Sequence, residues 1–254
     1  MTLTLEYLPQ TAYAFMLIFA RSGAMIMGLP GIGDRTVPPR IRLVLALALA
    51  VILYPLVNTA FPPLPKSVNA IIAAMAGEIM IGLAIGFTVR MIISAIQVAG
   101  SLIAVQTGLA FAQNVDPTQG IQSTLFSSFL SVLAVTLVFA TDMHHLLLAA
   151  MHDSYILFKP GSGLPSGDFA KVALETLANG FRIATQLAAP FLVFGLIFYL
   201  GVGVLTRLIP QVQVFFLAMP ANIMLGLVLV MLLLSTMMIW FMDYFGAAIR
   251  PYLA

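Results

Sequence analysis

The sequence predicts an all-α, polytopic membrane protein, and three observations lead to this prediction. Apolar residues make up 61% of the 254 residues and charged residues only 8%, against about 45–50% and about 25% in soluble domains. Long stretches of the chain carry no charge. Turns rich in Pro and Gly separate these stretches. A chain of this composition cannot cover its core with polar groups, so lipid or apolar protein surface must surround it.

The charge balance and the cysteine count exclude several other classes. The chain has 11 basic and 9 acidic side chains, for a formal net charge of +2. It therefore lacks the basic footprint of a nucleic-acid-binding protein and the composition of a disordered chain. It contains no cysteine, which rules out disulfides and Cys-based metal sites.

Seven apolar segments are predicted, most of them close to the roughly 20 residues that a spanning helix needs. They lie at about 8–29, 41–57, 68–89, 91–112, 121–141, 190–209 and 221–245. The last is expected to begin near Ile223, because Pro210 and Pro220 interrupt the residues before it. The first is not expected to be a cleavable signal peptide, because it lacks a basic leading region.

Small residues predict how two of these segments pack. Gly82 and Gly86 lie four residues apart, and Gly100 and Gly108 continue the pattern in the next segment. Such spacing lets helix backbones approach closely, so we expect 68–89 and 91–112 to form a tight hairpin. Helix packing within the chain and packing on neighbours in an oligomer are both open interpretations.

The distribution of Lys and Arg predicts an orientation. Placing the N-terminus outside puts most of the basic residues inside, provided that all seven segments cross the membrane. Farther along the chain, Asp168 is expected to N-cap an amphipathic helix over 168–188.

Two charges lie within apolar segments. Arg21 is in the first segment and Glu78 is in the third. A charge at bilayer depth is costly and should face a partner or water. Two alternatives are open: the two side chains pair with each other, or each lies nearer an interface than the segment boundaries indicate.

No catalytic, cofactor or metal site is predicted. The only cluster of possible metal ligands comprises Asp142, His144, His145, His152 and Asp153. It lacks a recognised ligand spacing and follows an apolar segment, so we interpret it as a polar helix end. Ser101 has no base near it in the sequence, which argues against an intramembrane hydrolase using Ser101 or His145.

The residues between two charge-free runs predict a flexible hairpin tip. The helical pattern weakens at Gly108 and is expected to end near Asp116, because Pro117 disfavours helix in the residue before it. The alternative is an ordinary tight turn.

Four blocks of sequence, in order, carry a resemblance that covers most of the chain. They are residues 31–43, 77–87, 99–120 and 207–220. In these blocks the sequence resembles the FliR/SctT family of type III export-gate proteins. The resemblance implies a non-enzymatic subunit of the bacterial inner membrane and the flagellum basal body. It implies an assembly with FliP and FliQ, association with FlhB and FlhA, and a path for exported flagellar proteins.

The resemblance also implies a domain organisation and candidate site residues. It implies one membrane domain over 1–254 made of bent helical hairpins, with a FliP-like part (about 1–165) followed by a FliQ-like part (about 166–254). The stretch 106–122 resembles a plug that closes the channel. Candidate plug residues are Gly108, Phe111, Asp116, Pro117 and Gly120; candidate packing or inter-subunit residues are Arg21, Glu78, Gly82, Gly86, Arg207, Pro210 and Gln211.

Two alternatives to a flagellar export gate remain at this point. The first is an export-gate subunit of an injectisome. The second is a small-solute permease, although two intramembrane charges are few for a transport relay.

Overall fold

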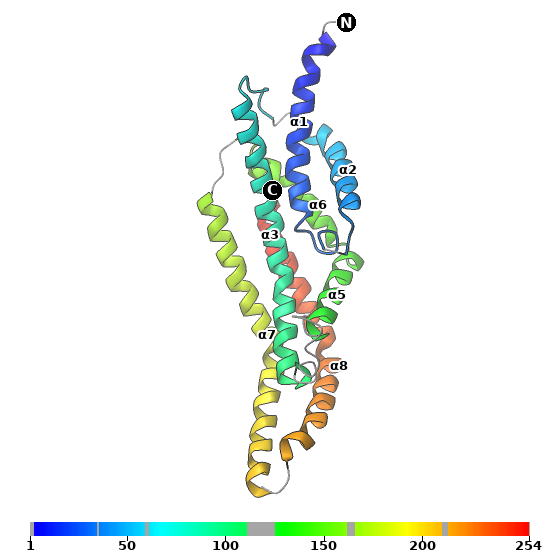
Figure 1. The fold of residues 1–254 in the computed structure, drawn as a ribbon, viewed down its shortest axis with the longest axis vertical. Helices are drawn as coiled ribbons and strands as arrows, with labels where there is room; N and C mark the ends of the chain where they lie inside the picture. The colour runs from blue at the N-terminus through cyan, green and yellow to red at the C-terminus, as the bar shows by residue number, and fades with distance from the viewer. Residues whose placement is uncertain are drawn as a thin grey trace. The chain divides into compact units, whose positions relative to one another are not determined.

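The computed structural model describes residues 3–34, 36–58, 61–110, 125–161, 166–209 and 213–253. Within these ranges the chain forms helices and no strand (Figure 1). The α-helices are α1 (Leu3–Ile26), α2 (Pro39–Val57), α3 (Val68–Gln106), α5 (Leu125–Ala140), α6 (His144–Leu157), α7 (Ser166–Leu208) and α8 (Val214–Ile249), and a short 3-10 helix, η3 (Arg250–Tyr252), follows. The predicted all-α class is confirmed.

The chain divides into two compact units that alternate along the sequence. Unit 1 comprises Met1–Ile92, Phe139–Leu177 and Gly246–Ala254, and unit 2 comprises Ile93–Val138 and Ala178–Phe245. The long helices α3, α7 and α8 therefore contribute residues to both units. The FliP-like and FliQ-like division near residue 165 remains a prediction.

One face of α1 forms much of the core of unit 1. Tyr13, Leu17, Arg21 and Met25 recur every four residues and are all buried, as expected for one side of a helix. α1 packs against α2 and, through small residues, against α3. A side chain at Gly82 would collide with the Arg21 carbonyl oxygen, so the small residues on α3 allow the two backbones to touch.

Helix α3 corrects the predicted hairpin. Residues 68–89 and 91–112 do not form two helices; one helix runs from Val68 to Gln106. The single charge between them, Arg90, is exposed on the helix surface and does not end the helix. A turn between two antiparallel helices needs about 2–5 residues of its own, and no Pro or Gly lies within three residues of Arg90 to supply one.

Prolines terminate fewer helices than expected. α7 runs through Pro190 and α8 through Pro220, because one missing donor is tolerated in a long apolar helix. α8 consequently begins at Val214 rather than near Ile223. α7 begins at Ser166, so Asp168 lies inside its first turn and is not the N-cap.

Helix α6 was not predicted. Its polar residues concealed its helical pattern, and the stretch after Ala140 was interpreted as a polar helix end. The structure has a second helix there, bent by 74° from α5. Asp142, with a φ of 57°, marks the break.

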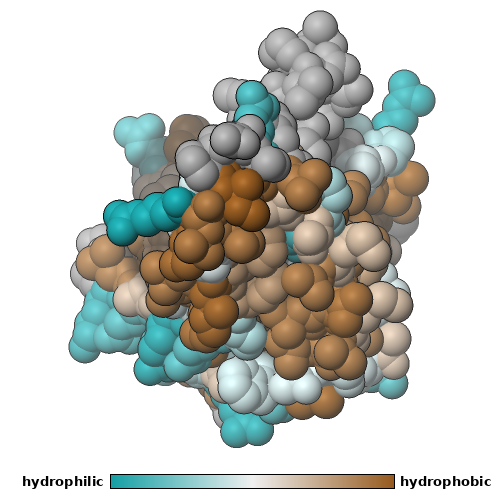
Figure 2. Space-filling model, turned by 90° about the horizontal axis from the view of Figure 1, so that it is seen from below, coloured by the Kyte–Doolittle hydropathy of each residue, from teal (hydrophilic) through white to brown (hydrophobic). Residues whose placement is uncertain are grey.

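Four described helices are long and apolar enough to cross a membrane, or five if α5 and α6 form one broken span. The assumption of seven crossings is therefore wrong, and the orientation derived from it loses its basis. The outer surface supports a membrane environment: Met231 and Leu232 on α8 are 80% and 72% exposed, and apolar side chains dominate the face in Figure 2. Lipid or apolar protein must cover such a surface.

Candidate functional site: two buried helix-end junctions

The C-terminal end of α3 immediately precedes the predicted plug. The helix ends at Gln106, and the predicted end near Asp116 lies outside the described residues. Gly108 follows with a φ of 74°, a left-handed conformation in which glycine commonly stops helices. Its amide donates to the Val105 carbonyl at 3.2 Å. The sequence indicated this weak point correctly: Thr107 and Gly108 form a turn that ends α3, and Leu109 and Ala110 after it are helical again.

Asn222 on α8 satisfies a backbone group at this helix end. Its Nδ2 donates to the Gln106 carbonyl oxygen at 3.2 Å and to the Tyr199 hydroxyl at 3.4 Å. The last four carbonyls of a helix lack partners within the helix, so this contact caps α3. Asn222 is only 2% exposed. A buried side chain of α8 thereby links the end of α3 to α7 in unit 2.

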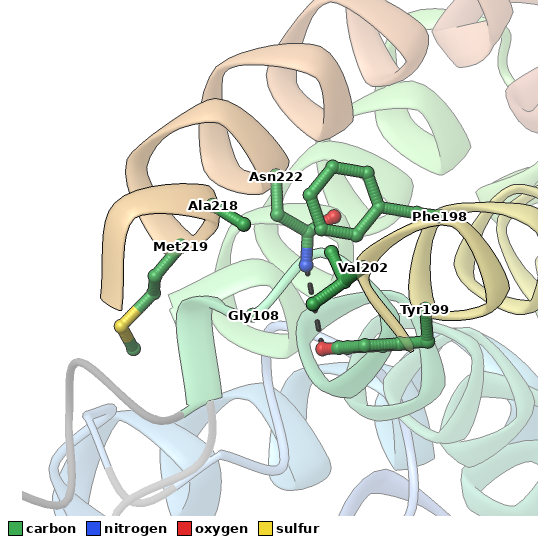
Figure 3. A pocket seen from close by; sticks show the side chains of 7 residues that line it. All are labelled: Gly108, Phe198, Tyr199, Val202, Ala218, Met219 and Asn222. Atoms are coloured by element: carbon green, nitrogen blue, oxygen red, sulfur yellow. Dashed lines mark hydrogen bonds between the residues drawn. The ribbon is translucent and has the colours of Figure 1, made fainter. Parts of the chain in front are cut away.

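The junction is closely packed (Figure 3). A cavity of about 10 Å³ remains there, which is room for about one water molecule. The figure shows the Asn222 amide directed towards the Tyr199 hydroxyl. The cavity is lined by Gly108, Phe198, Tyr199, Val202, Ala218, Met219 and Asn222. Its size fits a packing junction rather than a cofactor site.

Two glycines bring the neighbouring helices against the end of α3. A Cβ atom at Gly226 of α8 would collide with Thr107, and one at Gly195 of α7 would collide with the Gln106 amide. The last residues of α3 therefore lie in close contact with both α7 and α8.

A second junction, in unit 1, is built around Arg21. The side chain is fully buried, and its Nε donates to Glu78 Oε2 at 2.6 Å. Its other nitrogens donate to backbone oxygens at the end of α6: Nη1 to Ser154 at 2.7 Å and Nη2 to Phe158 at 2.9 Å. The Tyr155 ring lies 4.2 Å from the guanidinium carbon. Of the two alternatives that the sequence left open, the structure shows the ion pair.

The Arg21 junction satisfies the requirements for burying charges. The carboxylate neutralises the guanidinium, and carbonyls at the negative end of the α6 dipole accept its remaining donors. Glu78 is 1% exposed. Removing either partner would leave a buried charge uncompensated. Arg21 thus fixes α1, α3 and α6 to one another.

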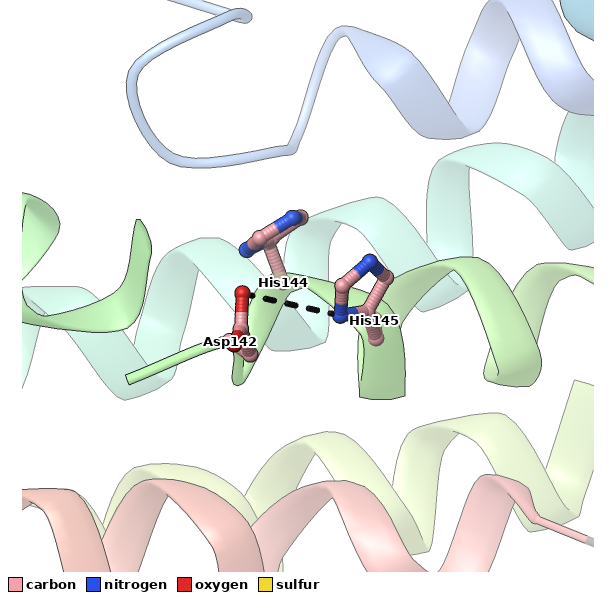
Figure 4. Close-up of side chains that lie close together, drawn as sticks. All are labelled: Asp142, His144 and His145. Atoms are coloured by element: carbon pink, nitrogen blue, oxygen red, sulfur yellow. Dashed lines mark ion pairs between the residues drawn. The ribbon is translucent and has the colours of Figure 1, made fainter. Parts of the chain in front are cut away.

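The His and Asp cluster divides in the structure. Asp142, His144 and His145 lie together at the break between α5 and α6 (Figure 4). The Asp142 carboxylate is 3.8 Å from His145 Nδ1, and both side chains are largely exposed. His152 instead contacts Asp153 at 2.8 Å.

The geometry of the first group is loose for a metal site. Tetrahedral zinc with bonds of about 2.0–2.1 Å requires ligand atoms about 3.3 Å apart, and here they are within 4.8 Å. The absence of a metal site stays a prediction. The Ser101 hydroxyl bonds to the Gln97 carbonyl and to Ser127, which are packing contacts rather than a nucleophile–base pair.

The remaining predicted residues fall into two groups. Gly82 and Gly86 lie where α3 contacts α1, and Arg207 is exposed in the last turn of α7. The other candidates lie outside the described residues: Phe111, Asp116, Pro117, Gly120, Pro210 and Gln211.

Sequence reasoning missed Asn222 and Tyr199. A signal for Asn222 was present, because it is a strongly polar side chain within a long charge-free apolar run. Polar residues within such runs usually face protein rather than lipid. Tyr199 carried no comparable signal, since its ring suits an apolar helix with or without a hydroxyl partner.

The sequence matches known bacterial export proteins. Residues 12–248 match the family model for bacterial export proteins, family 1. A relative from Caulobacter vibrioides, named flagellar biosynthetic protein FliR, is 44% identical over 90% of this chain and 91% of its own length. Relatives with the same name from Bacillus subtilis and Escherichia coli are 30% and 28% identical, over 93% and 80% of this chain and 92% and 77% of their own lengths. The chain therefore belongs to the bacterial export proteins, family 1.

Proposed function

We propose that this chain is a subunit of the flagellar type III protein export gate, where it forms and gates the path for unfolded flagellar subunits. The single observation that carries the proposal is the family match over 12–248. The flagellar names of the relatives favour a flagellar system over an injectisome. The apolar outer surface supports a membrane protein whose helices are shared with neighbours.

The proposed partners are FliP and FliQ within the gate, with FlhB and FlhA beside it, in the inner membrane at the flagellum basal body. The first part of the chain, to about residue 165, corresponds to FliP-like helices. The remainder corresponds to a FliQ-like hairpin. Support for the hairpin comes from α7 and α8, which meet across the small cavity at Asn222. In this function the chain acts by packing and movement, without bond chemistry.

The proposed gate is the segment 106–122, which begins at the Asn222 junction. A narrow apolar constriction blocks ions by excluding water. A segment held at a left-handed glycine can move as a unit when a polypeptide arrives. Gly108 supplies that glycine, and the amide of Asn222 holds the backbone two residues before it.

The proposal is tested by membrane permeability. Trimming residues 110–119, or replacing Gly120, should make cells expressing the assembled gate leak ions or small molecules. A matched control is Gly201→Ala, because a Cβ atom at Gly201 meets nothing within 4 Å. Unchanged permeability in the trimmed variant, with normal assembly, would contradict the plug role.

The permease alternative predicts a different result. Purified protein reconstituted alone in liposomes would then take up a small solute. Motility and filament assembly separate the two functions, since an export-gate subunit is required for both and a permease for neither.

A further inference from the structure

A groove that no proposed step uses opens in unit 1. It has a volume of about 610 Å³ and lies between α1, the turn at Pro62–Pro65, the residue Gly161 and the first turns of α3. Its walls are fixed by specific contacts. The Gln10 side chain of α1 donates to the Pro62 carbonyl at 3.1 Å and accepts from the Leu64 amide at 2.6 Å. These two hydrogen bonds hold the turn at Pro62–Pro65 in place beside α1, so the shape of the groove is fixed.

The floor of the groove is a row of small residues on α3. Ala70, Ala73, Ala74 and Gly77 all line it, at the three- and four-residue spacing of one helix face. A Cβ atom at Gly77 would meet none of the described residues within 4 Å, so the described part of the chain leaves the space above it open. In membrane proteins, a row of small residues on one helix lets a second helix pack closely against it.

A buried polar group lines the same groove. Tyr13 on α1 is 3% exposed, and its hydroxyl has no hydrogen-bond partner among the described residues. The hydroxyl oxygen is closed to solvent in the isolated chain. Because burying an unpaired hydroxyl is unfavourable, a small turn of the Tyr13 side chain towards an occupant that bonds to it would stabilise the docked state. The neighbouring Glu78 carboxylate is already neutralised by Arg21. The lining of the groove therefore favours an apolar occupant that carries one uncharged polar group.

We propose that this groove is the docking site for one hydrophobic helix of a neighbouring subunit in the export gate. That helix presents small residues to Ala73 and Gly77, and one Ser, Thr, Asn or Gln side chain to the Tyr13 hydroxyl. A lipid chain fits less well, because it offers the hydroxyl no hydrogen bond. The inference rests on the proposed function and adds to it a location for one subunit contact.

Cross-linking tests the location directly. Because the sequence contains no cysteine, an introduced cysteine is the only site on this chain that a thiol-reactive cross-linker can label. Gly77→Cys, labelled with a photo-crosslinker in the assembled complex, should give a protein adduct. Ile72→Cys is the matched control, because Ile72 is 60% exposed on the same helix but does not line the groove. We expect at least a fivefold higher yield at Gly77. Equal yields, or only lipid adducts at Gly77, would overturn the proposal.

A groove-filling variant tests whether docking is required. Gly77→Leu places its side chain in open space, so the thermal unfolding midpoint of the isolated chain should not fall. Incorporation into the complex should fall at least tenfold, whereas Gly77→Ala should assemble normally. Normal assembly of Gly77→Leu would refute the docking site. If the wild-type chain itself recruits no partner, the proposed function fails instead, so the two failures are distinguishable.

Tyr13→Phe tests the hydrogen bond. Without the unpaired hydroxyl, the isolated chain should unfold at the same or a higher temperature, while its affinity for the complex should drop about threefold or more. An increase in both stability and assembly would show that the occupant makes no bond to Tyr13, and would overturn that part of the proposal.

Discussion

Two helix ends in this protein are capped by side chains from other helices, and they differ in chemistry. At the end of α6, Arg21 donates charge-assisted bonds of 2.7 and 2.9 Å and is itself paired with Glu78. At the end of α3, Asn222 donates neutral bonds of 3.2 and 3.4 Å. Charge-assisted hydrogen bonds are roughly twice as strong as neutral ones. The Arg21 junction is therefore suited to permanent attachment, and the Asn222 junction to reversible contact.

This difference in bond strength matches the position of each junction in the chain. The Arg21 junction joins α1, α3 and α6 inside unit 1. The Asn222 junction lies directly before that segment and leaves its own Oδ1 without a partner among the described residues. A gate needs an attachment that holds in the closed state and yields at modest cost. Neutral bonds to a helix end satisfy both conditions.

The largest effect is expected at Arg21. Arg21→Met leaves Glu78 buried without its partner, and breaking a buried pair in this way costs about 3–5 kcal/mol. Thermal unfolding of the purified protein in detergent should show a large fall in midpoint. The double variant Arg21→Met/Glu78→Met should recover much of the loss, because well-packed apolar residues can replace a buried pair. A single variant as stable as the wild type would show that the junction is not a fixed attachment.

A smaller effect is expected where α3 contacts α1. Gly82→Ala places a methyl group against the Arg21 carbonyl oxygen, and overpacking of this kind costs about 1–3 kcal/mol. Gly201→Ala is the control, since its methyl group meets nothing within 4 Å and alanine favours helix. Equal unfolding midpoints for the two variants would contradict the close approach of α1 and α3.

Asn222→Ala should reduce stability only modestly and affect gating more. Loss of the bond to the Gln106 carbonyl costs about 0.5–1.5 kcal/mol. If this bond retains the base of the gate segment, cells carrying the variant should leak ions at rest. Cells carrying Gly201→Ala should not, because a Cβ atom there meets no described residue within 4 Å. If cells carrying Asn222→Ala do not leak ions, the contact between Asn222 and Gln106 has no role in the proposed gating.

The smallest effect is expected from Tyr199→Phe. Its hydroxyl is only a 3.4 Å partner of Asn222, so stability should change by about 0.5 kcal/mol or less, at the weak end of the range for one hydrogen bond. Permeability should lie between that of the wild type and Asn222→Ala. A loss as large as that of Arg21→Met would reverse the ranking of the two junctions.

The sequence predicted the helical membrane class, and it identified Arg21 and Glu78 as two charges that could pair, because composition and isolated charges are visible without coordinates. It did not predict that α3 is continuous, since a single charge such as Arg90 resembles a segment boundary until its exposed position is known. It also did not predict α6, whose carbonyls and Tyr155 ring contact Arg21 only once the chain is folded. The Asn222 junction depends on three segments meeting in space, and no local pattern encodes that meeting.

The break between α5 and α6 has a consequence for how the protein is made. The two helices have 16 and 14 residues, or about 24 and 21 Å, and neither alone matches a hydrocarbon thickness of about 30 Å. The peptide groups at the break cannot face lipid tails without a hydrogen-bonding partner. We therefore expect a newly made chain to need its partner subunits as soon as it is inserted into the membrane. Its synthesis should then be matched to that of the partner subunits, and surplus copies should be degraded.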